Sequence, residues 1–104
     1  MVGGFDGATL VGVGVVTPEI RPGTAQLAYL HVSHAYRRRG VGGHLTREMM
    51  VWAKAEGARC MVVSATPSES AVGFYTSRGF TPMREPVPEL YALEPEDIHM
   101  VVDL

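Results

Sequence analysis

The residues best suited to bind a ligand form a basic and glycine-rich stretch, Arg37–Arg39 followed by Gly40–Gly43. A guanidinium group binds phosphate oxygens through two parallel hydrogen bonds, and glycine lets the backbone approach a ligand closely. An apolar segment ends at Val32, and an amphipathic segment follows the glycines. The first N–H groups of a helix are unpaired and favour an anion. The stretch therefore predicts a pyrophosphate-binding turn between a strand and a helix.

Other readings of this stretch are less consistent with the sequence. Leu45 stands where a dinucleotide-binding fingerprint needs its third glycine, and no Gly-Lys-Ser/Thr of a P-loop follows. A run of arginines is often only a solvated turn, but the glycines and the preceding strand favour a binding role. The four histidines show no metal-ligand spacing, so we expect no metal.

The elements that position this turn follow from hydrophobic periodicity and turn residues. Strands are predicted at about residues 2–5, Thr9–Val16, Thr24–Val32, Met61–Ala65, Phe80–Met83 and Ile98–Leu104, helices at about Val41–Glu56 and Ser68–Arg78, and loops at Pro18–Gly23 and Arg84–Asp97. Strands that alternate with helices in a small domain indicate an α/β fold with a parallel core.

Local signals refine the first half of the chain. Asp6-Gly7 predicts a hairpin turn, and Gly12 and Gly14 predict that something packs closely against the second strand. The strand Thr24–Val32 is apolar on both faces, so we expect it inside a sheet that is covered on both sides.

Two further signals concern the helices. The first helix presents one apolar face formed by Val41, Leu45, Met49 and Trp52, and Gly57 is a plausible residue to follow its end. Thr66 and Glu69 have the spacing of a capping box at the start of the second helix.

Composition limits the class of protein. The 104 residues suit one domain, with 46% hydrophobic and 19% charged residues. A net charge of −2 argues against a general nucleic-acid binder. The single cysteine, Cys60, fits a reducing compartment, and no apolar run approaches the roughly 20 residues of a membrane span. We therefore expect a cytoplasmic protein that binds neither nucleic acid nor membrane.

Two motifs together resemble one known family. Arg37-x-x-Gly40-x-Gly42 resembles the acyl-CoA signature of the GNAT-type N-acetyltransferases, and Ala71-x-x-Phe74-Tyr75-x-x-x-Gly79-Phe80 resembles the second conserved segment of that family. The resemblance implies a mixed central sheet with splayed parallel strands flanked by two helices. The resemblance starts at the family's second strand, so the chain corresponds to a short form without the usual first strand and two helices. Such a short form is a minimal member of the family, a fragment, or a chain that a partner completes.

The resemblance also implies the site. The pantetheine arm of acetyl-CoA would lie between the strand ending at Val32 and the strand Met61–Ala65. Residues implied in cofactor binding are Leu30, Val32, Arg37, Arg38, Arg39, Gly40, Val41, Gly42, Gly43, Ser68, Phe74 and Tyr75. The backbone N–H of Val32 would polarise the thioester carbonyl, and Tyr75 would protonate the leaving thiolate.

The general base stays open. Gln26 stands where some family members carry a glutamate, and Glu19, His31 and water are the alternatives; His31 is also a candidate for substrate contact. Cys60 lies in neither motif, so we expect direct transfer of the acetyl group to a primary amine. The alternative is a non-catalytic acyl-CoA-binding or regulatory module. A sheet without its usual first wall would expose apolar surface, so we also expect a homodimer.

Overall fold

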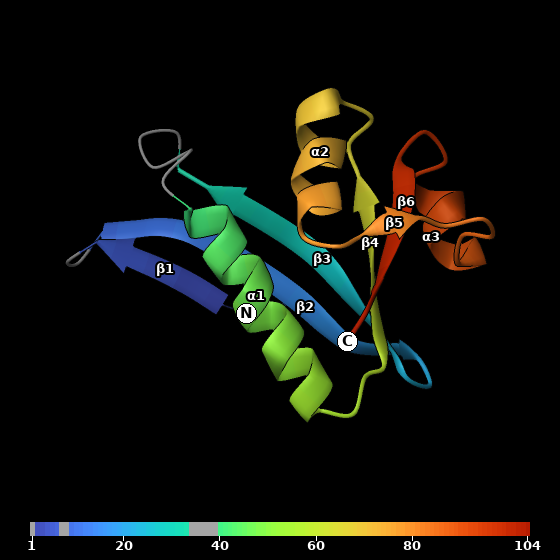
Figure 1. The fold of residues 1–104 in the computed structure, drawn as a ribbon, viewed down its shortest axis with the longest axis horizontal. Coiled ribbons are helices and arrows are strands. Elements are labelled where there is room, and N and C mark those ends of the chain that lie inside the picture. Colours follow the sequence, from blue (N-terminus) through green and yellow to red (C-terminus); the bar gives the residue numbers. More distant parts are fainter. Residues whose placement is uncertain (1, 7–8, 34–39) are drawn as a thin grey trace.

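The computed structural model describes residues 2–6, 9–33 and 40–104, whose strands form one mixed sheet (Figure 1). The strand order is β1-β2-β3-β4-β6-β5. The strands are β1 (Val2–Asp6), β2 (Thr9–Arg21), β3 (Thr24–Val32), β4 (Cys60–Ala65), β5 (Thr81–Pro82) and β6 (Ile98–Asp103), and the helices are α1 (Val41–Ala55), α2 (Glu69–Ser77) and α3 (Pro88–Leu93). β3 and β4 are parallel, and the other neighbouring strands are antiparallel. The predicted α/β class is confirmed.

The parallel strands separate along their length. Their paired register runs from Thr24 opposite Cys60 to Leu27 opposite Val63, although β3 continues to Val32 and β4 to Ala65. Figure 1 shows the carboxyl ends of β3 and β4 diverging. The splayed strands expected from the resemblance are therefore present, and they open the sheet at its centre.

Helix α1 packs on β2 through two glycines. A Cβ atom on Gly12 would lie 3.0 Å from Cδ1 of Leu45, and one on Gly14 would lie 2.7 Å from the sulfur of Met49. A larger residue would push the helix away from the strand. The close packing predicted for these glycines is confirmed.

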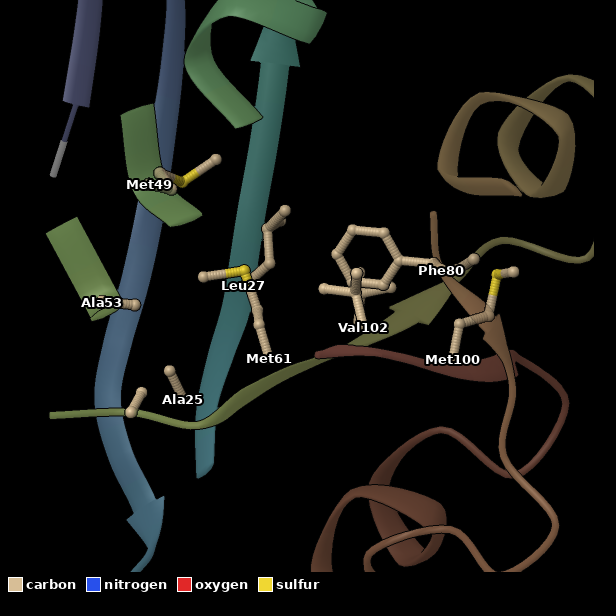
Figure 2. Packing of buried hydrophobic residues seen from close by; sticks show 11 residues of the cluster. Ala25, Leu27, Met49, Ala53, Met61, Phe80, Met100 and Val102 are labelled. Atoms are coloured by element: carbon tan, nitrogen blue, oxygen red, sulfur yellow. The ribbon is translucent and has the colours of Figure 1, made fainter. Parts of the chain in front are cut away.

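The buried core joins α1 to β3, β4 and β6 (Figure 2). Leu27, Met61 and Met100 come from the three strands, and Phe80 lies in the same cluster with none of its surface exposed. Phe80 directly follows Gly79, whose φ of 95° ends α2 in a left-handed turn. Burial of Phe80 therefore fixes the end of α2 against the sheet.

The predicted burial of two elements needs correction. Leu45 and Met49 of α1 are buried as predicted, but Trp52 is 41% exposed and Ala53 takes its place, because Ala53 lies four residues after Met49 on the same face. Strand β3 is covered at Leu27 but exposed at Tyr29, where β4 has diverged and no longer pairs with it.

The prediction of a loop at Pro18–Gly23 is wrong for most of these residues. β2 continues to Arg21, and only Pro22 and Gly23 form the turn. The register between β2 and β3 is irregular between Thr17 and Arg21, so the missing N–H of Pro18 costs no regular ladder bond.

Two boundaries in the second half also differ from prediction. Ser68, and not Thr66, caps α2: its Oγ accepts a hydrogen bond from the N–H of Ala71 at 3.2 Å. The N–H of Ser68 bonds to the carbonyl of Thr66 in a turn before the helix. The predicted loop Arg84–Asp97 contains α3, because proline is well tolerated at the first helical position.

The predicted hairpin turn at Asp6-Gly7 reaches outside the described residues, although β1 and β2 pair as antiparallel strands. Among the described helices, none combines the length and the hydropathy that a membrane span requires.

Candidate functional site

A cleft of about 480 Å³ occupies the opening between the diverging ends of β3 and β4. Its described lining residues are Leu27, Ala28, Tyr29 and Leu30 of β3, Val63, Ser64 and Ala65 of β4 with the following Thr66, Ala71, Phe74 and Tyr75 of α2, and Glu94 and Asp97 between α3 and β6. A ligand in this cleft would lie against strand main chain on both sides, as an added strand would.

The cleft reaches both faces of the sheet. Tyr75 packs against the core cluster on the face that carries Met61 and Val63. Successive strand side chains point to opposite faces, so Ser64 belongs to the other face. In Figure 1, β4 and β6 lie between α2 and α3. The wall formed by α2 and the wall formed by Glu94 and Asp97 are therefore on opposite sides of the sheet.

Tyr75 is the titratable group on the α2 wall. Its ring makes edge-to-face contacts with Phe74 and Phe80, with ring centroids 5.1 and 5.4 Å apart. Burial among these residues raises the pKa of the Tyr75 hydroxyl above its usual 10.0. The phenol is therefore protonated at neutral pH and can donate a proton.

Glu94 and Asp97 form a carboxyl pair on the opposite wall. A side-chain hydrogen bond to Asp97 raises the pKa of Glu94, and desolvation and the like charge of Asp97 act in the same direction. A nearby cation would relieve this repulsion.

The start of α1 has the features expected of an anion site. Gly40 caps the helix with φ 78°, offers no side-chain acceptor, and is followed by a first turn without acidic residues. A Cβ atom on Gly42 would lie 3.4 Å from the Phe74 ring and 3.5 Å from Val32. Since Phe74 also lines the cleft, the start of α1 and the cleft share one wall.

Arg78 adds a charge at the same place. Its guanidinium lies 5.1 Å from the centre of the Phe74 ring, and a Cβ atom on Gly43 would collide with it. The guanidinium of Arg78 thus lies next to the first turn of α1, where a positive charge favours a phosphate.

The structure brings most of the predicted residues together around the cleft. Leu30, Phe74 and Tyr75 line it, Val32 lies beside Gly42, and Gly40, Val41 and Gly43 form the start of α1. Arg37, Arg38 and Arg39 lie outside the described residues.

Three predicted or alternative residues lie elsewhere. His31 is exposed and stacks on Tyr29, and neither it nor Ser68 is among the described residues that line the cleft. The Ser68 hydroxyl is used as the cap of α2. Glu19 is exposed on β2, which β3 separates from the cleft.

Sequence reasoning missed five residues of this region, Ser64, Arg78, Glu94, Asp97 and His99. Arg78 follows Phe74 by four residues at the end of a predicted helix, and this spacing could have revealed it. Nothing local connects Ser64 with His99, because the pairing of β4 with β6 brings them together. Within the described part of the chain, no three His, Cys, Asp or Glu residues are arranged to hold a metal ion.

Comparison with known proteins agrees with this geometry. A model of the acetyltransferase (GNAT) family matches residues 1–80. The structure is similar to that of PaiA N-acetyltransferase from Thermoplasma acidophilum in complex with coenzyme A, with a TM-score of 0.80 and 20% identity over 98% of this chain and 58% of that chain. It is also similar to IAA acetyltransferase from Bacillus cereus, with a TM-score of 0.80 and 23% identity over 96% and 74% of the two chains.

A third similar structure is that of a GNAT family acetyltransferase from Elizabethkingia anophelis with acetyl-CoA bound, with a TM-score of 0.76 and 18% identity over 92% and 70% of the two chains. At these identities the likeness shows the fold. The chain spans 58% of the PaiA chain, which is less than two thirds of its length. No functionally curated protein matches the sequence.

Proposed function

The chain belongs to the acetyltransferase (GNAT) family, and we propose that it transfers the acetyl group of acetyl-CoA directly to a primary amine. The observation that carries the proposal is the position of Phe74, which borders both the cleft and Gly42 at the start of α1. A single extended ligand can therefore place an anionic group at the helix and its other end beside Tyr75.

The parts of acetyl-CoA match this surface in order. Its pyrophosphate would bind at the first turn of α1, where Arg78 supplies a cation. Its pantetheine arm would lie in the cleft against the main chain of β3 near Leu30. Its thioester would then lie beside Tyr75, in the opening between β3 and β4.

Tyr75 has the chemistry that the leaving group needs. As the amine nitrogen forms its bond to the acetyl carbon, the bond from that carbon to sulfur breaks and the thiolate takes a proton from the Tyr75 hydroxyl. Glu94 and Asp97 attract a cationic acceptor to the opposite side of the sheet. The donor and the acceptor thus enter from different faces.

The test is thiol release from acetyl-CoA in the presence of a panel of monoamines, diamines, polyamines and peptide amino termini, with mass spectrometry of the products. We expect acetylation of at least one cationic amine. Binding of acetyl-CoA without acetylation of any amine would contradict the proposal.

That second outcome would favour the alternative, a non-catalytic acyl-CoA-binding or regulatory module. The observation in its favour is Gln26 on β3, since an amide cannot take a proton at the position where some relatives carry a glutamate.

A homodimer is part of the proposal. Val51 and Trp52 on the outer side of α1 are 62% and 41% exposed, and burial against a second copy would remove this apolar surface from water. Light scattering at micromolar concentration tests it, and a monomeric mass would contradict it.

A further inference from the structure

Ser64 and His99 form a hydrogen-bonded pair on the acceptor side of the cleft. They are directly opposite each other in the register of β4 and β6, and Oγ of Ser64 lies 3.1 Å from Nδ1 of His99. The Nε2 atom of His99 lies 2.9 Å from the main-chain carbonyl oxygen of Glu94. Ser64 lines the cleft, whereas His99 is only 6% exposed behind it.

The hydrogen-bond partners of His99 determine the tautomer of its neutral ring. A carbonyl oxygen only accepts hydrogen bonds, so Nε2 carries the proton and donates it to Glu94. Nδ1 of the neutral ring is then an acceptor, and it receives the hydroxyl proton of Ser64. The lone pairs of Ser64 Oγ consequently remain available to a donor in the cleft.

Ser64 and His99 are arranged as a relay, so that a proton can pass from the cleft through the hydroxyl to the imidazole. A hydroxyl touches the ligand space, an imidazole next to it can gain a proton, and a third group holds the imidazole in one tautomer. The candidates for a base named from the sequence are less well placed, since Gln26 cannot gain a proton and the described Glu19 and His31 do not line the cleft. Glu94 and Asp97 do line it, and in the proposed function they attract the cationic acceptor.

We propose that Ser64 and His99 accept the proton that the attacking amine loses, with Ser64 as the group that contacts the amine. As the C–N bond forms, the amine proton passes to Ser64 Oγ while the hydroxyl proton of Ser64 passes to His99 Nδ1. The C–S bond breaks, and the thiolate takes the proton of Tyr75. The imidazolium then loses a proton to water and the phenolate regains one, so charges and protons balance.

The groups around His99 suit a transient imidazolium. The Tyr91 ring lies 5.9 Å from the imidazole, and the Glu94 carboxyl interacts with it electrostatically. Asp97 is hydrogen-bonded to Glu94 and extends the negative surroundings. His99 itself acts through Ser64 and is therefore a positioning and proton-holding residue.

The inference rests on the proposed function, and its test keeps the two apart. The variants are Ser64→Ala, which breaks the relay at the cleft, and His99→Gln, whose amide N–H can still bond to the Glu94 carbonyl but whose side chain cannot gain a proton. Ser77→Ala is the matched control, because its hydroxyl bonds to the Phe74 carbonyl on the outside of α2.

The readout is kcat/KM between about pH 5 and 8, calculated on the concentration of neutral amine so that titration of the acceptor is removed. The amine is the best acceptor from the panel described above. Acetyl-CoA titration calorimetry and circular dichroism show whether each variant is folded and binds the donor.

We expect the wild type and Ser77→Ala to lose activity toward acidic pH. We expect Ser64→Ala and His99→Gln to lose on the order of 10²–10⁴-fold in kcat/KM at neutral pH and to show no such decline. Wild-type activity or an unchanged pH profile in folded Ser64→Ala would overturn the relay and leave the acetyltransferase proposal intact. If His99→Gln fails to fold, Ser64→Ala decides alone. Absence of turnover with every amine in the wild type would overturn both.

Discussion

The guanidinium group of Arg78, at the end of α2, lies directly over Gly43, in the first turn of α1. A side chain on Gly43 would collide with it, so the glycine is what allows the cation to approach the helix terminus. The two helices therefore meet at the place where we expect the pyrophosphate of acetyl-CoA.

We predict that Arg78→Gln weakens binding of acetyl-CoA about tenfold and leaves binding of acetyl-pantetheine unchanged, because only the first ligand carries phosphates. Titration calorimetry with the two ligands measures the difference. Arg59→Gln, which removes an exposed arginine near Gly23, is the control. Equal losses for both ligands would show that Arg78 acts through the fold and not through the phosphates.

We predict that Tyr75→Phe lowers kcat on the order of 10²–10⁴-fold while the affinity for acetyl-CoA is retained, because the ring stays and only the proton donor is lost. Steady-state rates and calorimetry check the two parts. Tyr91→Phe is a matched control, since it also removes a hydroxyl but keeps the ring that lies near His99, and Tyr91 is 52% exposed on α3 and does not line the cleft among the described residues. An unchanged kcat in Tyr75→Phe would remove Tyr75 as the acid.

The raised pKa of Tyr75 also predicts a pH dependence of stability. The unfolded tyrosine ionises near pH 10, and burial keeps the folded one protonated to higher pH. The contribution of Tyr75 to the free energy of unfolding is therefore fully present below about pH 10. It is lost as the pH rises through the pKa of Tyr75 in the folded protein. Urea denaturation above pH 10 should show a steeper loss of stability in the wild type than in Tyr75→Phe. Parallel losses in both proteins would contradict this.

The contact between Gly14 and Met49 predicts a non-additive pair of substitutions. Gly14→Ala places a Cβ atom 2.7 Å from the Met49 sulfur and should destabilise the fold by about 1–3 kcal/mol. Met49→Ala alone should cost about 2–5 kcal/mol, because it leaves a cavity in the core. The double variant should lose less than the sum, since the new methyl group occupies part of that cavity. Additive free energies of unfolding would show that the two sites are independent.

Much of the cleft could be predicted from local patterns. The glycines before α1 and the Phe74-Tyr75 pair on α2 are each defined by neighbours in the sequence, and the structure brings both to one wall. The α3 helix was missed because the prolines at positions 86, 88 and 95 predict a loop, although Pro88 lies in the first turn of the helix, where proline is tolerated.

The acceptor side could not be predicted in the same way. Ser64 and His99 meet only because β6 pairs antiparallel with β4 in one register, and a shift by one residue would place them on opposite faces. Similarly, Glu94 and Asp97 reach the cleft through the fold of the segment between α3 and β6. Long-range register is a tertiary property that local sequence does not specify.

Binding of acetyl-CoA between the start of α1 and Phe74 is tested by a calorimetric titration of the wild type, Gly42→Val and Gly73→Val with acetyl-CoA. A side chain on Gly42 would occupy the space between Phe74 and Val32, whereas one on Gly73 would meet open space on α2. We expect the wild type and Gly73→Val to bind acetyl-CoA and folded Gly42→Val not to bind it. Absence of binding by the wild type, or equal binding by all three proteins, would contradict this expectation.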